Sequence, residues 1–141
     1  MQYPLLCFIL IFSFKAGHSQ VGKGGAGIKD TIIITETNNA GKPKVLYGTA
    51  SYYADKFNGR ETANGEIYDS EKMTAACNVL PLGTWIRVTN LTNNRSVVVK
   101  TNDRLHIRMK RIVDLSRIAA KQLGYIGQGL TKVKVEVLEK K

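Results

Sequence analysis

The sequence predicts an all-β domain, a barrel or sandwich of short strands, over most of its 141 residues. From Val45 onward, runs rich in β-branched residues alternate with turn-forming residues, and little room remains for helices. The alternation is clearest near the C-terminus, where charged residues separate Val133, Val135 and Val137. This period of two is typical of a strand with one buried face and one face in water.

The N-terminal residues predict an export signal. Residues 4–14 are an apolar run, shorter than the roughly 20 residues that span a bilayer. Gly17 and Ser19 form the small-x-small pattern of a cleavage site before Gln20. We therefore expect residues 1–19 to be removed and the exported chain to begin near Gln20.

The cysteines and the next segment complete the domain organisation. Cys7 lies too early in the apolar run for lipid attachment, so we expect no stable membrane anchor. Without Cys7 only Cys77 remains, which excludes an internal disulfide. Residues 20–45 are rich in glycine and polar residues and read as a flexible lead-in, in which residues 32–34 could add an edge strand. The folded domain is expected at residues 46–138.

A hairpin and one helix are predicted within this domain. Residues 84–91 and 96–101 are β-rich runs on either side of an asparagine-containing turn, so they should pair antiparallel. A short helix is expected at residues 117–123, with Ser116 as its N-cap and Gly124 as its left-handed stop.

The charge is strongly basic. Lysine and arginine number 21 against 11 acidic residues, a formal net charge of +10. Such a balance suits a polyanionic partner or surface, although it also serves solubility. No RNP pattern, paired metal-ligand set or basic helix accompanies it, so we expect no nucleic-acid partner.

Three segments hold the residues with chemical potential: 62–66, 73–84 and 100–104. Each combines turn formers with one carboxylate or thiol between predicted strands. Loops on a rigid β scaffold are where binding and catalytic groups tend to lie.

Seven blocks in this chain form a recognisable series. They are residues 48–53 (Gly-Thr-Ala-Ser-Tyr-Tyr), 62–66 (Thr-Ala-Asn-Gly-Glu), 80–84 (Leu-Pro-Leu-Gly-Thr), 88–91 (Val-Thr-Asn-Leu), 102–104 (Asn-Asp-Arg), 112–120 (Ile-Val-Asp-Leu-Ser-Arg-Ile-Ala-Ala) and 123–124 (Leu-Gly). In this order they resemble the rare lipoprotein A (RlpA-like) family over about residues 47–138.

The resemblance implies a six-stranded double-psi β-barrel with one or two short helices, a fold shared with the expansins. It further implies an endolytic lytic transglycosylase. We expect the protein to be a monomer without metal or cofactor, and the export signal predicts that it acts in the periplasm or cell envelope. Such an enzyme cleaves MurNAc–GlcNAc bonds of peptide-poor peptidoglycan strands, leaves 1,6-anhydro-MurNAc ends and helps daughter cells separate. The resemblance marks Glu66 and Asp103 as site residues.

The chain departs from the family pattern at two positions. Cys77 stands where the best-known members have a histidine, and Leu105-His106 replaces a Gly-Pro pair. Cys77 could be a nucleophile beside a base such as His106, but a small, partly buried filler in the place of the histidine is the favoured interpretation. His106 could shuttle protons or be an ordinary loop histidine.

We expect Asp103 to be the acid/base, because it directly follows a predicted strand, and Glu66 to orient the sugar or tune the aspartate. The reverse roles remain open, as does a purely structural part for either residue in its turn. Asp114 is interpreted as structural.

Other side chains could assist or bind substrate. They are Tyr52, Tyr53, Asn64, Cys77, Asn102, Arg104 and His106. Phe57 and Trp85 could also stack on sugars, although a core role is the default expectation for Trp85. The alternative function is a non-catalytic, expansin-like peptidoglycan-binding module, which the loss of the histidine favours.

Overall fold

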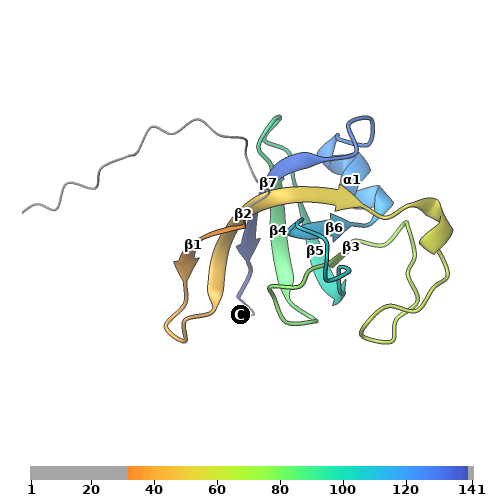
Figure 1. Ribbon diagram of the computed structural model, residues 1–141. Helices are drawn as coiled ribbons and strands as arrows, with labels where there is room; N and C mark the ends of the chain where they lie inside the picture. The colour runs from red at the N-terminus through yellow and green to blue at the C-terminus, as the bar shows by residue number, and fades with distance from the viewer. Residues whose placement is uncertain (1–31, 140–141) are drawn as a thin grey trace, which may run out of the picture.

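The computed structural model describes residues 32–139, and the expected signal peptide and cleavage site lie outside them. Six strands form a closed barrel (Figure 1). They are β2 (Pro43–Tyr52), β3 (Thr74–Ala76), β4 (Trp85–Asn90), β5 (Ser96–Asp103), β6 (Val113–Leu115) and β7 (Thr131–Val137). Their order is β2-β6-β3-β5-β4-β7, and pairing of β7 with β2 closes the sheet. The six-stranded barrel is confirmed.

The barrel mixes parallel and antiparallel pairs. β2 runs parallel to β6 and β3 runs parallel to β5, while β3 and β6 join these pairs antiparallel. Two short helices accompany the strands, a 3₁₀ turn η1 (Asp55–Phe57) and the helix α1 (Arg117–Leu123). A long connection leads from β2 through η1 to β3 and lies against one side of the barrel (Figure 1).

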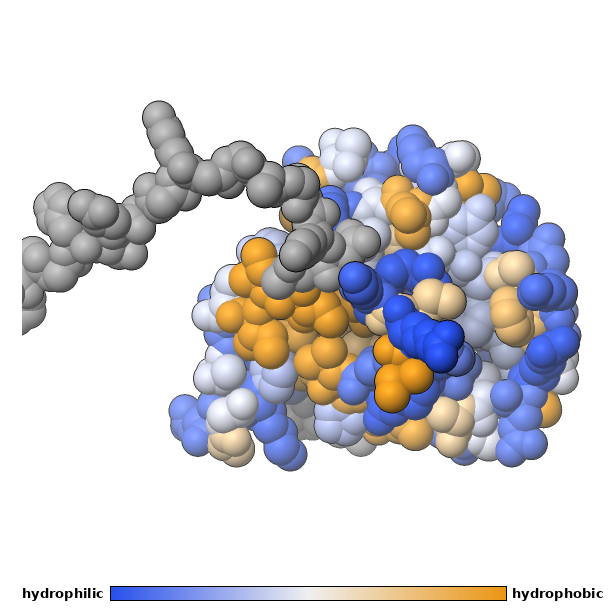
Figure 2. Space-filling model, viewed as in Figure 1, coloured by the Kyte–Doolittle hydropathy of each residue, from blue (hydrophilic) through white to orange (hydrophobic). Residues whose placement is uncertain are grey.

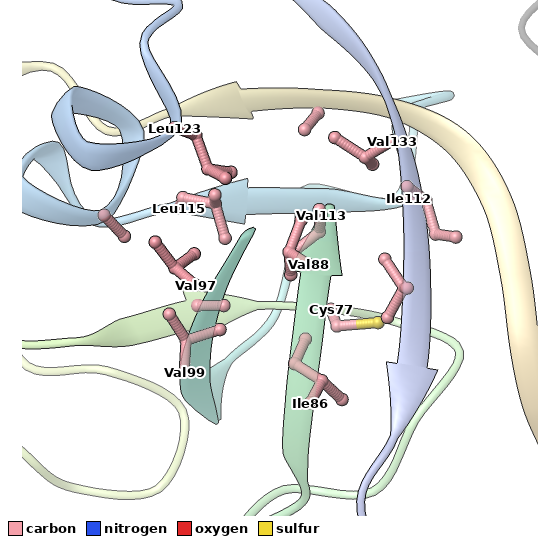
Figure 3. Close-up of a cluster of buried hydrophobic side chains, with 14 of the residues drawn as sticks. Cys77, Ile86, Val88, Val97, Val99, Ile112, Val113, Leu115, Leu123 and Val133 are labelled. Atoms are coloured by element: carbon pink, nitrogen blue, oxygen red, sulfur yellow. The ribbon is translucent and has the colours of Figure 1, made fainter. Parts of the chain in front are cut away.

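The predicted hairpin and final strand are confirmed. β4 pairs antiparallel with β5, and Asn94 in the connecting turn has a positive φ of 60°. On β7, the alternating valines Val133 and Val135 are buried. They belong to a core shared by all six strands and α1 (Figure 3).

The predicted helix has the expected bounds and its expected C-terminal stop. Gly124 is left-handed, with φ 77°, and its N–H donates to the carbonyls of Ala120 and Lys121. Ser116 occupies the N-cap position, but the expected side-chain cap is wrong, because its buried hydroxyl makes no hydrogen bond. Its backbone N–H instead donates to the Thr74 carbonyl at 3.0 Å, which ties the helix start to β3.

An edge strand precedes the barrel. β1 (Ile33–Thr37) pairs antiparallel with the first half of β2, so the last part of segment 20–45 joins the sheet. Both Ile33 and Ile34 are about half exposed. Figure 2 shows apolar side chains gathered on the side of the molecule that carries β1.

The expected core position of Trp85 is wrong. Along β4 the inward positions fall to Ile86 and Val88, which are completely buried. The strand period of two then places Trp85 on the outer face, where 41% of it is exposed.

No helix among residues 32–139 is long and apolar enough to cross a membrane.

Candidate active site

A cavity of about 560 Å³ lies between the barrel wall and the connection that follows β2. Strands contribute Tyr52, Ala76, Asp103 and Asp114 to its lining. The connection contributes aromatic and basic side chains, among them Tyr53, Phe57, Arg60 and Tyr68. Arg104, His106 and Arg111 line it from the segment between β5 and β6. Most of these charges are positive, which suits an anionic ligand.

Sheet register explains why two carboxylates face this cavity. Ala76 on β3 pairs with Asp103 on one side and with Asp114 on the other. Directly paired residues project from the same face of a sheet, and a small alanine between them leaves room in front of the wall. Asp103 and Asp114 therefore both face the cavity across Ala76.

Asp103 is held by three hydrogen bonds. The Tyr53 hydroxyl donates to its Oδ2 at 2.6 Å. The backbone N–H groups of Ala63 and Arg104 donate to its Oδ1 at 2.9 and 2.8 Å. Burial and the neighbouring Asp103 raise the pKa of Tyr53 well above its usual range, so the phenol stays protonated at neutral pH. The carboxylate thus has a fixed orientation in the cavity wall.

Aromatic rings line the cavity next to Asp103. Tyr53 stacks on Tyr68 with ring centroids 4.4 Å apart and meets the edge of Phe57 at 5.9 Å. Tyr52 packs instead against Tyr125, and its hydroxyl donates to the Ile126 carbonyl at 2.9 Å. These contacts fix the ring of Tyr53 beside Asp103.

Glu66 lies outside this cavity. It lines a separate hollow of about 310 Å³ together with Lys72, Thr74 and Asn102. The side-chain amide of Asn102 donates to Glu66 Oε2 at 2.9 Å. Hydrogen bonds from Asn102 and Asn64, together with nearby lysines, lower the pKa of Glu66, so it is ionised at neutral pH.

The turn that carries Glu66 is closed by its own polar groups. Asn64 Oδ1 accepts the Thr62 hydroxyl at 2.7 Å and the Glu66 N–H at 3.1 Å. The backbone N–H of Asn64 donates to the Asn102 carbonyl at 3.2 Å, which fastens the turn to the end of β5. Asn64 and Asn102 therefore hold the turn in place.

Cys77 lines none of the described cavities. Its side chain lies in the core with Ile86 and Val88, and only 1% of the residue is exposed (Figure 3). Burial raises the pKa of its thiol, which disfavours the nucleophilic thiolate. Cys77 is thus a core filler, buried more deeply than the partly buried position that the sequence predicts. His106 lines the cavity of Asp103, and its Nδ1 accepts the Arg108 N–H at 3.3 Å.

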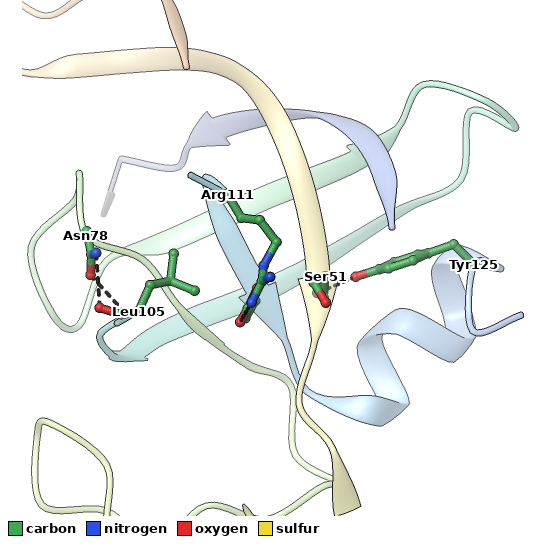
Figure 4. A network of polar contacts seen from close by, with 6 residues as sticks. Ser51, Asn78, Leu105, Arg111 and Tyr125 are labelled. Atoms are coloured by element: carbon green, nitrogen blue, oxygen red, sulfur yellow. Dashed lines mark hydrogen bonds and ion pairs between the residues drawn. The ribbon is translucent and has the colours of Figure 1, made fainter. Parts of the chain in front are cut away.

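Arg104 and Asn78 shape the loop after β5. The guanidinium of Arg104 donates to the carbonyls of Cys77 and Leu80. Asn78 and Leu105 exchange two hydrogen bonds, side chain to backbone in both directions (Figure 4). These bonds lock the 77–80 segment against the strand end that carries Asp103.

The sequence reasoning missed Arg111 and gave Asp114 only a structural role. The guanidinium of Arg111, labelled in Figure 4, donates to both carboxylate oxygens of Asp114, at 2.8 and 2.9 Å. Both residues line the cavity. The available clue was an ionisable residue between Val113 and Leu115, both completely buried, since strand alternation places it on the outer wall. No group of three or more metal-binding side chains occurs within residues 32–139.

Comparisons with known proteins agree with this architecture. A family model described as "Lytic transglycolase" matches residues 46–135. The endolytic peptidoglycan transglycosylase RlpA of Haemophilus influenzae is 44% identical over 111 residues, 79% of this chain and 39% of that protein. Its namesake in Pseudomonas aeruginosa is 52% identical over 94 residues, 67% of this chain and 28% of that protein. The chain thus spans well under half of these relatives.

Two solved structures share the fold. A Streptomyces papain inhibitor superposes with a TM-score of 0.55 at 20% identity, covering 68% of this chain and 96% of that one. An expansin of Clavibacter michiganensis superposes with a TM-score of 0.53 at 18% identity, covering 69% and 52%. At these identities the likeness concerns the fold alone.

Proposed function

This chain belongs to the lytic transglycolase family, in its RlpA-like branch, and on that basis we propose that it is an endolytic peptidoglycan lytic transglycosylase. Its substrate would be the MurNAc–GlcNAc bond of peptide-poor glycan strands, and its product a 1,6-anhydro-MurNAc end. The observation that carries the proposal is Asp103, fixed by three hydrogen bonds in the wall of a basic, aromatic-lined cavity.

The reaction requires one carboxyl group in two successive roles. Protonated Asp103 gives its proton to the glycosidic oxygen as the bond to MurNAc C1 breaks. The carboxylate then takes the proton of the MurNAc C6 hydroxyl while that oxygen attacks C1. The new C6–O–C1 bond closes the anhydro ring, water is not consumed, and the acid regains its proton.

Tyr53 would position this acid rather than replace it. Its raised pKa keeps the proton on the phenol, so Tyr53 is a poor base at neutral pH. A phenol can both donate and accept a hydrogen bond, so Tyr53 can stay bonded to Asp103 in either protonation state.

Glu66 is the weaker choice for the acid. It lies outside the basic, aromatic-lined cavity that Asp103 faces, in the smaller hollow with Asn102. We therefore assign Glu66 to holding the 62–66 turn and contacting the glycan beside the reacting bond.

A second candidate is a non-catalytic glycan-binding module. The observations that favour it are Cys77 in place of the family histidine and the shared fold with an expansin. The intact Asp103 and the RlpA relatives favour the enzyme.

We further propose that the chain is exported and acts as a monomer in the periplasm or cell envelope. The apolar run at residues 4–14 with its small-x-small site supports export, and peptidoglycan lies in that compartment.

The test compares wild type, Asp103→Asn and Asp55→Asn on purified and peptide-stripped peptidoglycan. Asp55 is the matched control, because it is an exposed aspartate that does not line the cavity. We expect Asp103→Asn to lower the release of 1,6-anhydromuramyl products, measured by mass spectrometry, by about 10²- to 10⁴-fold. Asp55→Asn should match wild type.

A folded Asp103→Asn protein that releases these products at the wild-type rate would refute the assignment of the acid. If wild type binds the strands but releases no product, the binding module is the correct function.

A further inference from the structure

Trp85 is the single tryptophan of the chain, and it lies on the outer face of β4 with 41% of its surface exposed. The ammonium group of Lys100 lies over its ring, 6.0 Å from the centroid. The two residues pair directly across β4 and β5. An exposed indole beside a lysine therefore forms one small apolar and cationic platform.

This platform continues into the hollow that holds Glu66. Lys100 pairs with Trp85 on one side and with Thr74 of β3 on the other. Thr74 lines the Glu66 hollow together with Lys72. The charges of Lys100 and Lys72 both act on the Glu66 carboxylate. A continuous surface therefore runs across the barrel wall from Trp85 to Glu66.

The charges along this surface are unequal. Glu66 and Asp69 lie in the hollow, and Asp69 is 4.0 Å from Lys72. Among the described residues, Lys100 takes part in none of the ion pairs. At the Trp85 end, an anionic group of a ligand would therefore meet a lysine that takes part in no ion pair within residues 32–139.

We propose that Trp85 and Lys100 form a binding subsite for a muramic acid unit that carries a free carboxylate. The apolar face of a pyranose ring stacks on an indole, and the lactyl carboxylate of MurNAc suits an ammonium group. That carboxylate is free only where the stem peptide has been removed. The subsite rests on the proposed function and extends it, because it supplies a physical reason for preferring peptide-stripped strands.

The first test uses the fluorescence of Trp85. Excitation at wavelengths that tyrosine does not absorb reports on this residue alone. The Asp103→Asn protein is titrated with peptide-stripped glycan strands, so that the strands stay intact, and in parallel with chitin oligosaccharides, which lack the lactyl carboxylate. We expect a saturable change in emission with the strands, weakened by salt, and at least a several-fold weaker response with chitin.

The second test uses cleavage kinetics of Trp85→Ala, Trp85→Tyr and Lys100→Gln. We expect KM for stripped strands to rise about five-fold in Trp85→Ala and Lys100→Gln with kcat nearly unchanged, and to recover partly in Trp85→Tyr. Val98→Ala is the matched control, since Val98 is equally exposed on the same outer face of β5. It should leave KM unchanged.

The two levels of the proposal fail differently. If wild type cleaves the strands, Trp85→Ala has an unchanged KM and the strands do not change the emission, the subsite is overturned. The proposed function then stays intact. If the strands change the emission and Lys100→Gln weakens this response, the subsite is supported. If the wild-type protein nevertheless never cleaves the strands, the proposed enzymatic activity is overturned. Equal responses to chitin and to stripped strands overturn the role of the carboxylate.

Discussion

Gly48 is the position where the barrel leaves no space for a side chain. It lies in β2, opposite Val133 of β7. A Cβ at this position would lie 2.9 Å from Cβ and 3.0 Å from Cγ2 of Ile112, which is completely buried. The neighbouring Ile112 N–H donates to the Thr49 carbonyl at 2.9 Å, so the two backbones are fixed against each other. The Cβ and Cγ2 atoms of Ile112 are not at the far end of a flexible side chain, so the backbone must move to admit the new Cβ.

We expect Gly48→Ala to lower the free energy of unfolding by about 1–3 kcal/mol, the usual cost of overpacking a core. Alanine also lowers the conformational entropy of the unfolded chain, which offsets about 0.4–1 kcal/mol of this loss. The measurement is urea denaturation followed by circular dichroism. Gly127→Ala is the matched control, because its Cβ would meet nothing within 4 Å. Stability in Gly48→Ala equal to that of wild type or of the control would show that the β2–Ile112 contact is looser than described.

Two further predictions concern the site. Cys77→Ser should lower the free energy of unfolding by about 1–3 kcal/mol, because it places a hydroxyl in the core. The kcat per folded molecule should stay near that of wild type. Complete loss of cleavage in the folded variant would contradict this. Because folding lowers the pKa of Glu66, its stabilisation should be present above the ordinary value of 4.5 and lost as pH falls through the lower folded value. The stability gap between wild type and Glu66→Gln, from urea midpoints at several pH values, should therefore shrink on acidification, and a gap that widened would contradict it.

The elements that local chemistry dictates could be predicted from the sequence. Alternating valines gave β7, and Gly124 ended α1 in the expected left-handed conformation. The error at Trp85 arose because hydrophobicity alone does not say which face of a strand is inward. Strand register decides that, and here Ile86 and Val88 take the inner positions.

The sequence could name candidate site residues but not their arrangement. Asp103 and Glu66 were both identified, yet the sequence could not place them at different cavities. Arg111 was not identified, and Asp114 was given only a structural role. Their place at the cavity depends on the pairing of Ala76 with Asp103 and Asp114 across three strands, which long-range register sets. Only the fold brings Asp114 to the same wall as Asp103.

The separation of Glu66 from Asp103 follows from strand geometry and helps to assign their roles. Asn102 and Asp103 are consecutive on β5; the Asn102 amide binds Glu66, whereas Asp103 lines the larger cavity. The turn between the two hollows also supplies the Ala63 N–H to Asp103. Anchoring this turn through Glu66 therefore holds a hydrogen-bond donor on Asp103, the proposed acid. On that proposal, Glu66 affects catalysis as a positioning residue without exchanging a proton itself.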